Sequence, residues 1–304
     1  MSCLFPFKRY RLLDGSIADS ERGLLSEKNP PINTFYTPCG QCGECRLSRA
    51  RSWATRCVHE ATFWKESCFI TLTYKETPPG NSLDPDDTRN FIRRFRDQFK
   101  KPFKYFLVGE YGDNFDRPHY HALIFGTDFG YTNHHKNKSS DLELLHDTNA
   151  LSCPQLNDIW GLGFTSVGEL TFDSAAYCAQ YAMKKINGPK AKAHYGTRHP
   201  EFMRTSQNAI GKQYALRFAT EIINNNSVIS NSQKQPIPPY YLKQYEKQNL
   251  DLTDLKISRE EFSETHSIQK SYTRACLLDS KFKLKKSKSD AFRIRYAKDA
   301  YFNS

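Results

Sequence analysis

The sequence contains no apolar run that could cross a membrane. A membrane-spanning helix needs about 18 or more consecutive apolar residues, and no stretch of this chain approaches that length. Residues 1–8 also lack an apolar segment of signal-peptide length. We therefore expect a protein that makes no membrane contact and stays in the compartment where it is made.

Two further features, typical of repetitive or secreted proteins, are missing. No internal repeat is visible in the sequence. The nine cysteines are irregularly spaced, with three of them clustered, and they do not resemble the framework of a disulfide-rich secreted domain. In a reducing compartment these cysteines are thiols or metal ligands.

Acidic residues are outnumbered by basic ones. The chain has 44 Lys and Arg against 33 Asp and Glu, which gives a net charge of +11. A basic balance of this size favours a polyanionic partner, most simply nucleic acid. The charge would also suit an acidic membrane surface or an acidic protein, so the choice of partner depends on the motifs.

What the sequence does contain is the pattern of a mixed core of helices and strands. Its 304 residues are 38% hydrophobic, enough for one large domain or two modest ones. Apolar periodicity and turn signals predict strands over 68–74, 103–110, 119–126 and 164–169, a polar exposed loop over 127–150, and three helices: 44–64, one that Asp84 caps, and one that Asp173 or Ser174 caps and that ends near 187. The order β-α-β-β-β-α predicts an α+β fold, a single antiparallel sheet backed by helices.

The chain divides into three predicted parts. Residues 1–65 carry the cysteine cluster and the basic helix, residues 66–222 form the sheet-containing core, and residues 223–304 form a basic C-terminal extension that is weakly structured or helical. Within the extension, residues 281–298 hold eight Lys or Arg and one acid. This charge run suits either a solvated tail or an arm that contacts DNA.

Two histidines separated by one residue, His119 and His121, fall within a predicted strand. Alternate strand residues point to the same face, so both imidazoles can bind one divalent metal ion. Glu110 ends the preceding predicted strand, and in an antiparallel pair it lies beside His119 as a third ligand, unless it is simply a solvated carboxylate. Two imidazoles and a carboxylate leave positions open for water and phosphate oxygens. This set suits Mg²⁺ or Mn²⁺ and does not exclude Zn²⁺.

Tyr177, Tyr181 and Lys184 recur at i, i+4 and i+7 in the last predicted helix, which places them along one stripe. Such a stripe by itself indicates core packing with a lysine that reaches solvent. Beside a metal site, the two phenols become candidate nucleophiles. The pKa of a phenol is about 10, so it needs activation. The metal can polarise a phosphate, and Lys184 can neutralise an oxygen.

Cys39, Cys42 and Cys45 form two successive C-x2-C steps. A ferredoxin-type run would need a fourth cysteine followed by proline, and none follows Cys45. The cluster therefore fits either a structural Zn²⁺, with Cys3 or Cys57 as the fourth ligand, or a turn of free thiols.

The predicted helix over 44–64 carries several arginines beside its apolar stripe. We expect this basic helix to contact DNA through Arg46, Arg49, Arg51 and Arg56. Such binding would be strongly electrostatic, because each neutralised phosphate releases counterions.

Three ordered motifs resemble those of the HUH endonucleases, a family that initiates rolling-circle replication. Residues 69–74 (Phe-Ile-Thr-Leu-Thr-Tyr) are similar to the first motif, Pro118-His119-Tyr120-His121 to the HUH motif itself, and Tyr177, Tyr181 and Lys184 to the two-tyrosine third motif. Within this family the chain is most similar to the replication initiators of gokushovirus-type microviruses, small phages with single-stranded DNA. Residues 38–46, 200–202 and 210–211 also resemble that phage group. The resemblance covers residues 1 to about 215.

The resemblance implies roles for individual residues and for partners. Tyr177 and Tyr181 would be nucleophiles, and His119 and His121 would bind the metal. The third ligand varies across the family, so Glu110 rests on the strand argument. Tyr120 stands where the family usually has a bulky hydrophobe and is expected to point away from the metal. The implied partners are a phage origin, as single-stranded DNA and supercoiled duplex, and host helicase and polymerase in the bacterial cytoplasm.

The sequence therefore predicts a site-specific endonuclease that nicks one DNA strand and forms a 5′-phosphotyrosyl link. It would leave a 3′-OH for a polymerase and later rejoin the displaced genome. A plasmid relaxase or a transposase with the same site is one alternative. Another is a non-catalytic nucleic-acid-binding protein with a zinc knuckle and an RRM-like sheet, although the sequence lacks the clustered exposed aromatics of an RNP1 motif.

Overall fold

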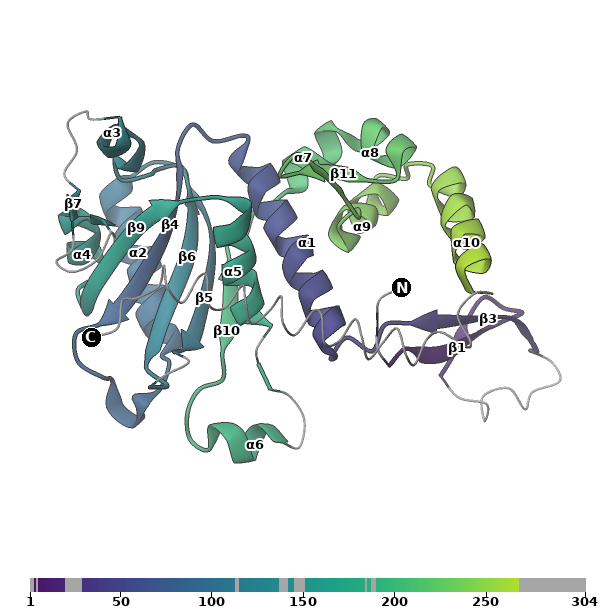
Figure 1. The fold of residues 1–304 in the computed structure, drawn as a ribbon, viewed down its shortest axis with the longest axis horizontal. Helices are drawn as coiled ribbons and strands as arrows, with labels where there is room; N and C mark the ends of the chain where they lie inside the picture. The colour runs from purple at the N-terminus through teal and green to yellow at the C-terminus, as the bar shows by residue number, and fades with distance from the viewer. Residues whose placement is uncertain are drawn as a thin grey trace. The chain divides into compact units, whose positions relative to one another are not determined.

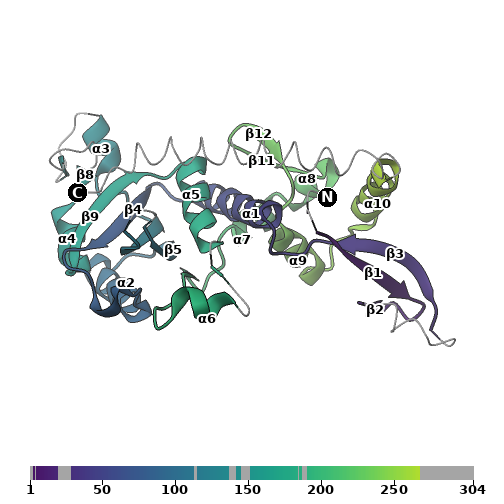
Figure 2. The same cartoon turned by 60° about the horizontal axis from the view of Figure 1, so that its bottom comes forward.

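The structure is a computed structural model that describes residues 3, 5–19, 29–112, 115–136, 142–144, 151–183, 185–186 and 190–267. The chain separates into two compact units, residues 1–49 and residues 50–304. In the first unit, β1 (Phe7–Leu12), β2 (Ile17–Ala18) and β3 (Pro31–Thr37) form an antiparallel sheet in the order β2-β1-β3, ahead of α1 (Gly43–Ala61), which runs into the second unit (Figures 1 and 2). The sequence patterns did not predict this small sheet.

The second unit contains a seven-stranded sheet in the order β10-β5-β6-β4-β9-β8-β7, in which every pairing is antiparallel. Its strands are β4 (Ser67–Tyr74), β5 (Lys104–Tyr111), β6 (Pro118–Phe125), β7 (Glu143–Leu144), β8 (Leu151–Ser152), β9 (Gly163–Glu169) and β10 (Phe202–Thr205). The four predicted strands and the predicted α+β class are confirmed. The three strands that were missed are two to four residues long, too short for a periodic signal.

Strand alternation gives this sheet two buried faces, each with its own core. One face packs against α2 (Pro85–Phe99) and α4 (Pro154–Trp160). Asp84 caps α2 as predicted, because its carboxylate accepts a hydrogen bond from the Asp86 N–H. The core on this face includes Ile70, Leu72, Phe91, Phe95, Tyr120 and Trp160, all of which are fully buried.

The opposite face of the sheet packs against α1 and α5 (Phe172–Ala182). Small residues on the two helices, Ala54, Cys57, Cys178 and Ala179, meet larger strand residues that include Phe106, Val108 and Phe125. This is the face on which the candidate site lies, because β6 turns His119 and His121 to the same side as Leu123 and Phe125.

The ends of α5 differ from the prediction. Its N-cap is Thr171, not Asp173 or Ser174: the Thr171 hydroxyl accepts from the Ser174 N–H, and the Ser174 hydroxyl accepts from the Thr171 N–H. This reciprocal capping box satisfies two free N–H groups, which a cap at Ser174 could not do. The helix ends at Ala182 rather than near residue 187.

The segment over 127–150 is less open than a polar exposed loop. Thr127, Asp128 and Phe129 are buried. The Asp128 carboxylate accepts hydrogen bonds from the N–H groups of Gly130 and Thr132, at 2.9 and 3.0 Å, and so holds the start of α3 (Tyr131–His135). A buried aspartate that organises a turn looks like any polar loop residue in sequence.

Residues beyond the sheet build a third core. After α6 (Lys190–Tyr195) come α7 (Lys212–Arg217), α8 (Ala219–Asn225), β11 (Val228–Ser230), β12 (Gln233–Gln235), α9 (Pro239–Lys247) and α10 (Thr253–Ser267). Their buried side chains include Ala215, Ile222, Tyr241, Tyr245 and Leu255. The extension is thus helical up to residue 267, and the basic run over 281–298 lies outside the described residues.

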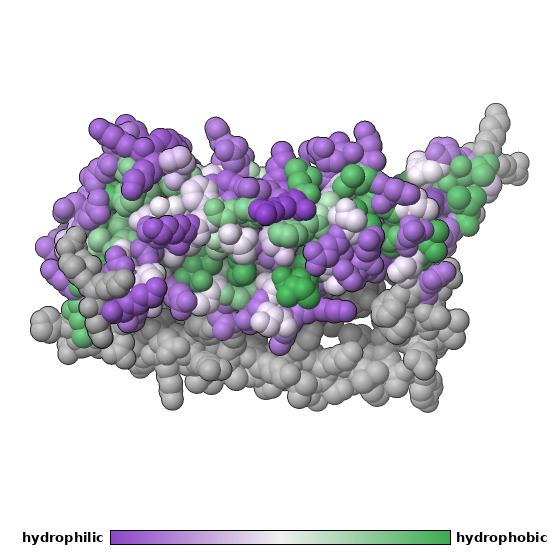
Figure 3. Space-filling view, turned by 90° about the horizontal axis from the view of Figure 1, so that it is seen from above, coloured by the Kyte–Doolittle hydropathy of each residue, from purple (hydrophilic) through white to green (hydrophobic). Residues whose placement is uncertain are grey.

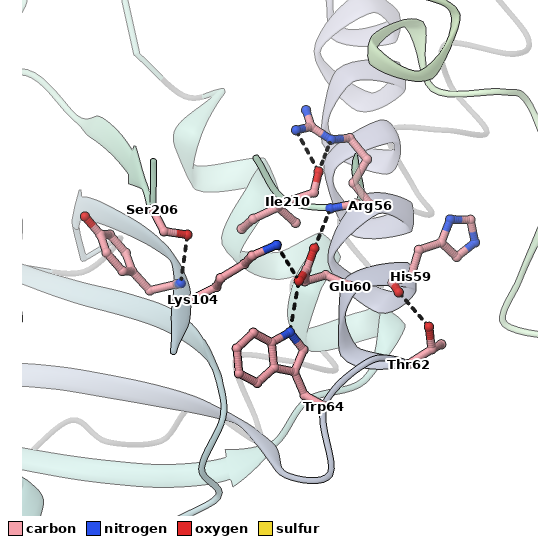
Figure 4. A network of polar contacts seen from close by, with 10 residues as sticks. Arg56, His59, Glu60, Thr62, Trp64, Lys104, Ser206 and Ile210 are labelled. Carbon is pink, nitrogen blue, oxygen red and sulfur yellow. Dashed lines mark hydrogen bonds and ion pairs between the residues drawn. The ribbon is translucent and has the colours of Figure 1, made fainter. Parts of the chain in front are cut away.

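Helix α1 is buried on a second side as well, by polar contacts (Figure 4). Glu60 accepts hydrogen bonds from the Trp64 indole at 2.9 Å and the Gly211 N–H at 2.8 Å, and it pairs with Lys104 at 2.7 Å. Arg56 donates twice to the Ile210 carbonyl, at 3.1 and 3.0 Å. These contacts fix α1 and the segment before α7 to the sheet.

The surface agrees with a basic, polar chain. Figure 3 shows one face of the molecule, on which hydrophilic side chains predominate and hydrophobic ones form small separate patches. No helix among the described residues is both long and apolar enough to span a membrane.

Candidate active site

Glu110, His119 and His121 converge on one point of the sheet. β5 and β6 pair so that Glu110 lies directly opposite His119, as predicted. The Glu110 Oε1 atom lies 2.8 Å from Nε2 of His119 and 3.0 Å from Nε2 of His121. Glu110 and His121 are buried, whereas the His119 side chain is partly exposed. The three residues form a possible metal-binding triad.

The other nitrogen of each imidazole is held by an oxygen. Nδ1 of His119 lies 3.0 Å from the Arg117 carbonyl oxygen, which can only accept, so this Nδ1 carries the proton. Nδ1 of His121 lies 3.0 Å from Oγ1 of Thr71, the residue opposite it on β4. These contacts aim both Nε2 atoms at Glu110. Outer partners of this kind orient histidine ligands in metal sites.

The donor set fits a divalent cation. With the proton on Nδ1, each Nε2 presents a lone pair, and two lone pairs cannot hydrogen-bond to a carboxylate oxygen. A proton on each ring or a cation among the three atoms resolves the conflict. Burial alone would raise the pKa of the Glu110 carboxyl, but His119 and His121 outweigh burial and hold that pKa below its ordinary value. The carboxylate is therefore charged and available as a ligand.

Both tyrosines of α5 lie against this triad. The ring centroids of Tyr177 and Tyr181 are 5.1 and 5.9 Å from that of His121 and 4.5 Å from each other. Phe69 stacks on His121 at 5.4 Å and contacts Tyr177 edge-on at 6.2 Å. The structure thus brings the predicted histidines and tyrosines into one site, with both phenols partly buried.

Lys184 lies outside the described residues, two positions after the last residue of α5. Another tyrosine of the chain, Tyr195, is buried, and its hydroxyl donates to a Glu201 carboxylate oxygen and accepts from the Ile186 N–H. Burial and Glu201 raise the pKa of Tyr195 to about 12. These contacts make Tyr195 a structural residue.

Tyr120 points away from the triad, as expected. Its ring is fully buried on the α2 side of the sheet, and its hydroxyl lies 2.8 Å from that of Tyr74 and donates to the Asp84 carbonyl at 3.0 Å. Sequence reasoning missed two supporting residues, Thr71 and Phe69. They occupy alternate positions of β4, so strand periodicity could have assigned them to the histidine face.

The four predicted cysteines also come together, in the N-terminal unit. The Sγ atoms of Cys3, Cys39, Cys42 and Cys45 lie within 4.8 Å of one another. Cys57, the alternative fourth ligand, is not in this cluster: it is fully buried in the core between α1 and the sheet.

The arginines of α1 differ in their environments. Arg51 is exposed, Arg46 is partly buried, and the exposed Arg49 donates to the Gly40 carbonyl at 2.8 Å. Arg56 is buried, and its guanidinium lies over the rings of Trp53 and Tyr240 at 3.8 and 4.0 Å. Because its charge is enclosed and its donors bind Ile210, Arg56 is unavailable for the DNA contact that the sequence suggested.

Comparison with known proteins identifies related sequences. Residues 67–186 match the model of a family of replication-associated proteins, the one described under the name ORF2. This match includes the triad and both tyrosines of α5. No solved structure matches the chain.

Individual relatives extend the similarity beyond this region. The chain is 31% identical over 257 residues to "Replication-associated protein VP4" of Bdellovibrio phage phiMH2K, which covers 81% of this chain and 78% of that protein. It is 29% identical over 275 residues to "Replication-associated protein ORF2" of Spiroplasma virus 4, covering 82% and 81% of the two chains. "Replication-associated protein ORF4" of Chlamydia phage 1 is 28% identical over 220 residues, or 68% of this chain and 53% of that protein.

Proposed function

This chain belongs to the family of phage replication-associated proteins and is a rolling-circle replication initiator, and we propose that it nicks one strand of a phage origin by tyrosine attack. The observation that carries this proposal is the contact of both α5 phenols with the ring of a triad histidine. A triad alone would suit hydrolysis by water, but two adjacent phenols supply the protein's own nucleophiles.

The phenol oxygen of Tyr177 or Tyr181 attacks the scissile phosphorus, and the bond from phosphorus to the 3′ oxygen breaks. The phenol proton leaves to solvent, and the departing oxygen takes up a proton to become a 3′-OH. The 5′ phosphate is now esterified to the tyrosine. Because this diester keeps the energy of the broken bond, a later attack by a 3′-OH can rejoin the strand without another energy source.

Each residue of the site has a defined task in this scheme. Glu110, His119 and His121 would hold Mg²⁺ or Mn²⁺, and such an ion supplies Lewis-acid stabilisation of charge on the phosphate. Thr71 keeps His121 aimed at the ion position, and Phe69 packs its ring. We assign Lys184 to neutralise a phosphate oxygen or the phenolate. Thiolates are poor partners for these hard cations, so the cysteine cluster takes no part in cleavage.

Two nucleophiles suit a replication cycle. One tyrosine holds the 5′ end made at initiation while the other cuts the regenerated origin. The freed 3′-OH then attacks the first phosphotyrosine and closes the circle. A host helicase and polymerase would act on the nicked template between these steps, in the bacterial cytoplasm.

A covalent adduct tests the proposal directly. We expect a labelled origin oligonucleotide with Mn²⁺ to give a protein–DNA band on a denaturing gel. Tyr177→Phe and Tyr181→Phe should each retain a band, and the double variant should lose it. Tyr105→Phe, on the other face of β5, is the matched control. A persistent adduct in the double variant, or no adduct in the wild type, would refute tyrosine nicking and favour the non-catalytic alternative.

We also propose that Arg46, Arg49 and Arg51 of α1 contact DNA phosphates. Affinity for the origin should then fall as salt rises, by roughly one log–log slope unit per phosphate neutralised. Replacing Arg51 with Gln should lower that slope by about one. An unchanged slope would remove this arginine from the interface.

A further inference from the structure

The cluster of Cys3, Cys39, Cys42 and Cys45 has the dimensions of a metal site. The Sγ atoms of Cys3 and Cys42 are 3.9 Å apart, and those of Cys39 and Cys45 are 4.0 Å apart. A tetrahedron of four sulfurs around Zn²⁺, with bonds of about 2.3 Å, has edges of about 3.8 Å. Disulfide sulfurs would be only about 2.0 Å apart, and none of the described cysteines forms a disulfide.

The backbone around the cluster is arranged for thiolates. The Cys39 N–H donates to Sγ of Cys3 at 3.2 Å, and the N–H groups of Gln41 and Cys42 donate to Sγ of Cys39 at 3.5 and 3.3 Å. Gly40, inside the first C-x2-C step, has a φ of 75°, a left-handed conformation that glycine adopts without strain. The turn thus folds the chain back and directs its amides at sulfur.

The N-terminal unit has little else to hold it together. Among its described residues, the buried apolar side chains are Cys3, Tyr10 and Leu12. A unit of about 50 residues cannot bury enough apolar surface for stability without a staple such as a disulfide or a metal. The cluster offers such a staple, since it joins the first described residue to the start of α1.

We propose that Cys3, Cys39, Cys42 and Cys45 bind one structural Zn²⁺ that folds the N-terminal unit. Four thiolates form a closed tetrahedral set, which leaves no position for a substrate and so excludes a catalytic role. Thiolates also select Zn²⁺ over the hard cations assigned to the triad. The ion closes a loop from Cys3 to Cys39 that contains all three strands of the small sheet. Metal binding and folding of residues 1–49 are then one event.

Zinc content in matched variants tests this inference. The full chain is purified in reductant and its zinc is measured by mass spectrometry, for the wild type, Cys39→Ser/Cys42→Ser and Cys153→Ser. The last is the control: Cys153 is the N-cap of α4, outside the cluster, where serine is a preferred residue. We expect the control to match the wild type and the double variant to hold one zinc fewer per chain. Any zinc at the triad is common to all three proteins and cancels in the difference.

A second measurement serves if the double variant fails to fold. Titration of wild-type protein with a thiol-specific mercurial should release one zinc per chain, as the cluster thiols are modified. Limited proteolysis should then cut within residues 1–49 before it cuts the sheet of the second unit. Equal zinc in the double variant and the control would overturn the proposal. So would a mercurial titration that releases no zinc, or mass mapping of Cys3–Cys42 and Cys39–Cys45 disulfides in reduced protein.

Discussion

The two ligand clusters of this molecule stand on different foundations. The triad of Glu110, His119 and His121 lies on a seven-stranded sheet with an apolar core on each face. The cysteine cluster lies in a unit whose described residues bury three apolar side chains. In the first region the fold exists without the ion and positions its ligands. In the second, the proposed ion takes the place of a core. One cluster therefore serves chemistry and the other serves folding.

Chelation should separate the two regions most sharply. Brief EDTA treatment should reduce adduct formation by at least about 10²–10³-fold, because charge on the phosphate loses its main stabilisation. The unfolding temperature of the second unit should stay the same, and added Mg²⁺ or Mn²⁺ should restore the adduct. Calorimetry and denaturing gels on one sample give both readouts. If EDTA melts the second unit, the triad ion is structural and the contrast is broken.

The next largest effect is expected from Glu110→Gln. The amide keeps the shape of the side chain but loses the charge that binds the cation, so the metal concentration for half-maximal cleavage should rise by about 10–100-fold. Excess Mn²⁺ should recover much of the activity. Titrating Mn²⁺ against adduct yield measures this shift. Unchanged metal dependence would mean that Glu110 is only a hydrogen-bond partner of the histidines.

Acid should act on the second unit through His59. This buried imidazole accepts from the Tyr241 hydroxyl at 2.9 Å and donates to the Ile229 carbonyl at 2.8 Å. Burial lowers the pKa of His59 to about 4, below the unfolded value of about 6.5. Neutral His59 therefore contributes full stability above pH 6.5, and this is lost as the pH falls toward 4.

Denaturant unfolding at several pH values checks this prediction. Between pH 6.5 and 4, the wild type should lose roughly 2 kcal/mol more unfolding free energy than His59→Gln. The glutamine variant is less stable at neutral pH but has no imidazole to protonate. Parallel curves for the two proteins would assign the acid sensitivity to another group.

The smallest effect is expected from Thr71→Val. Valine keeps the volume but loses the hydroxyl that orients Nδ1 of His121. Metal affinity should fall by about 10-fold, and stability by about 1 kcal/mol. Thr73→Val is the matched control, because Thr73 is on the same face of β4 but its hydroxyl donates to the Phe164 carbonyl. Equal metal affinity in the two variants would remove Thr71 from the site.

Much of the fold followed from periodicity. Strands β4, β5, β6 and β9 and helices α1 and α2 have apolar faces long enough to be recognised, and the strand pairing that sets Glu110 beside His119 follows from one short turn. The environment of Arg56 could not be predicted. A basic residue on an amphipathic helix indicates solvent, and only the distant Ile210 and Tyr240 reveal that α1 is buried there.

Other parts of the site depended on contacts that have no local signal. The capping box of Thr171 and Ser174 fixes where α5 starts, but three Ser, Thr or Asp residues within four positions are all acceptable caps. Cys3 joins cysteines that lie 36 residues or more away, so spacing could name it only as one of two options. Long-range closure of this kind needs the folded chain.

The register of β5 and β6 has a consequence for how faulty copies of this enzyme behave. A slip of one residue would turn His119 and His121 toward α2 and Tyr120 toward α5. It would also put the apolar residues of each core on the wrong face, so the mispaired sheet could not pack. Misassembled nuclease would then be removed as unfolded protein instead of persisting as an inactive competitor at the origin. The pattern that builds the two cores also acts as proofreading for the active site.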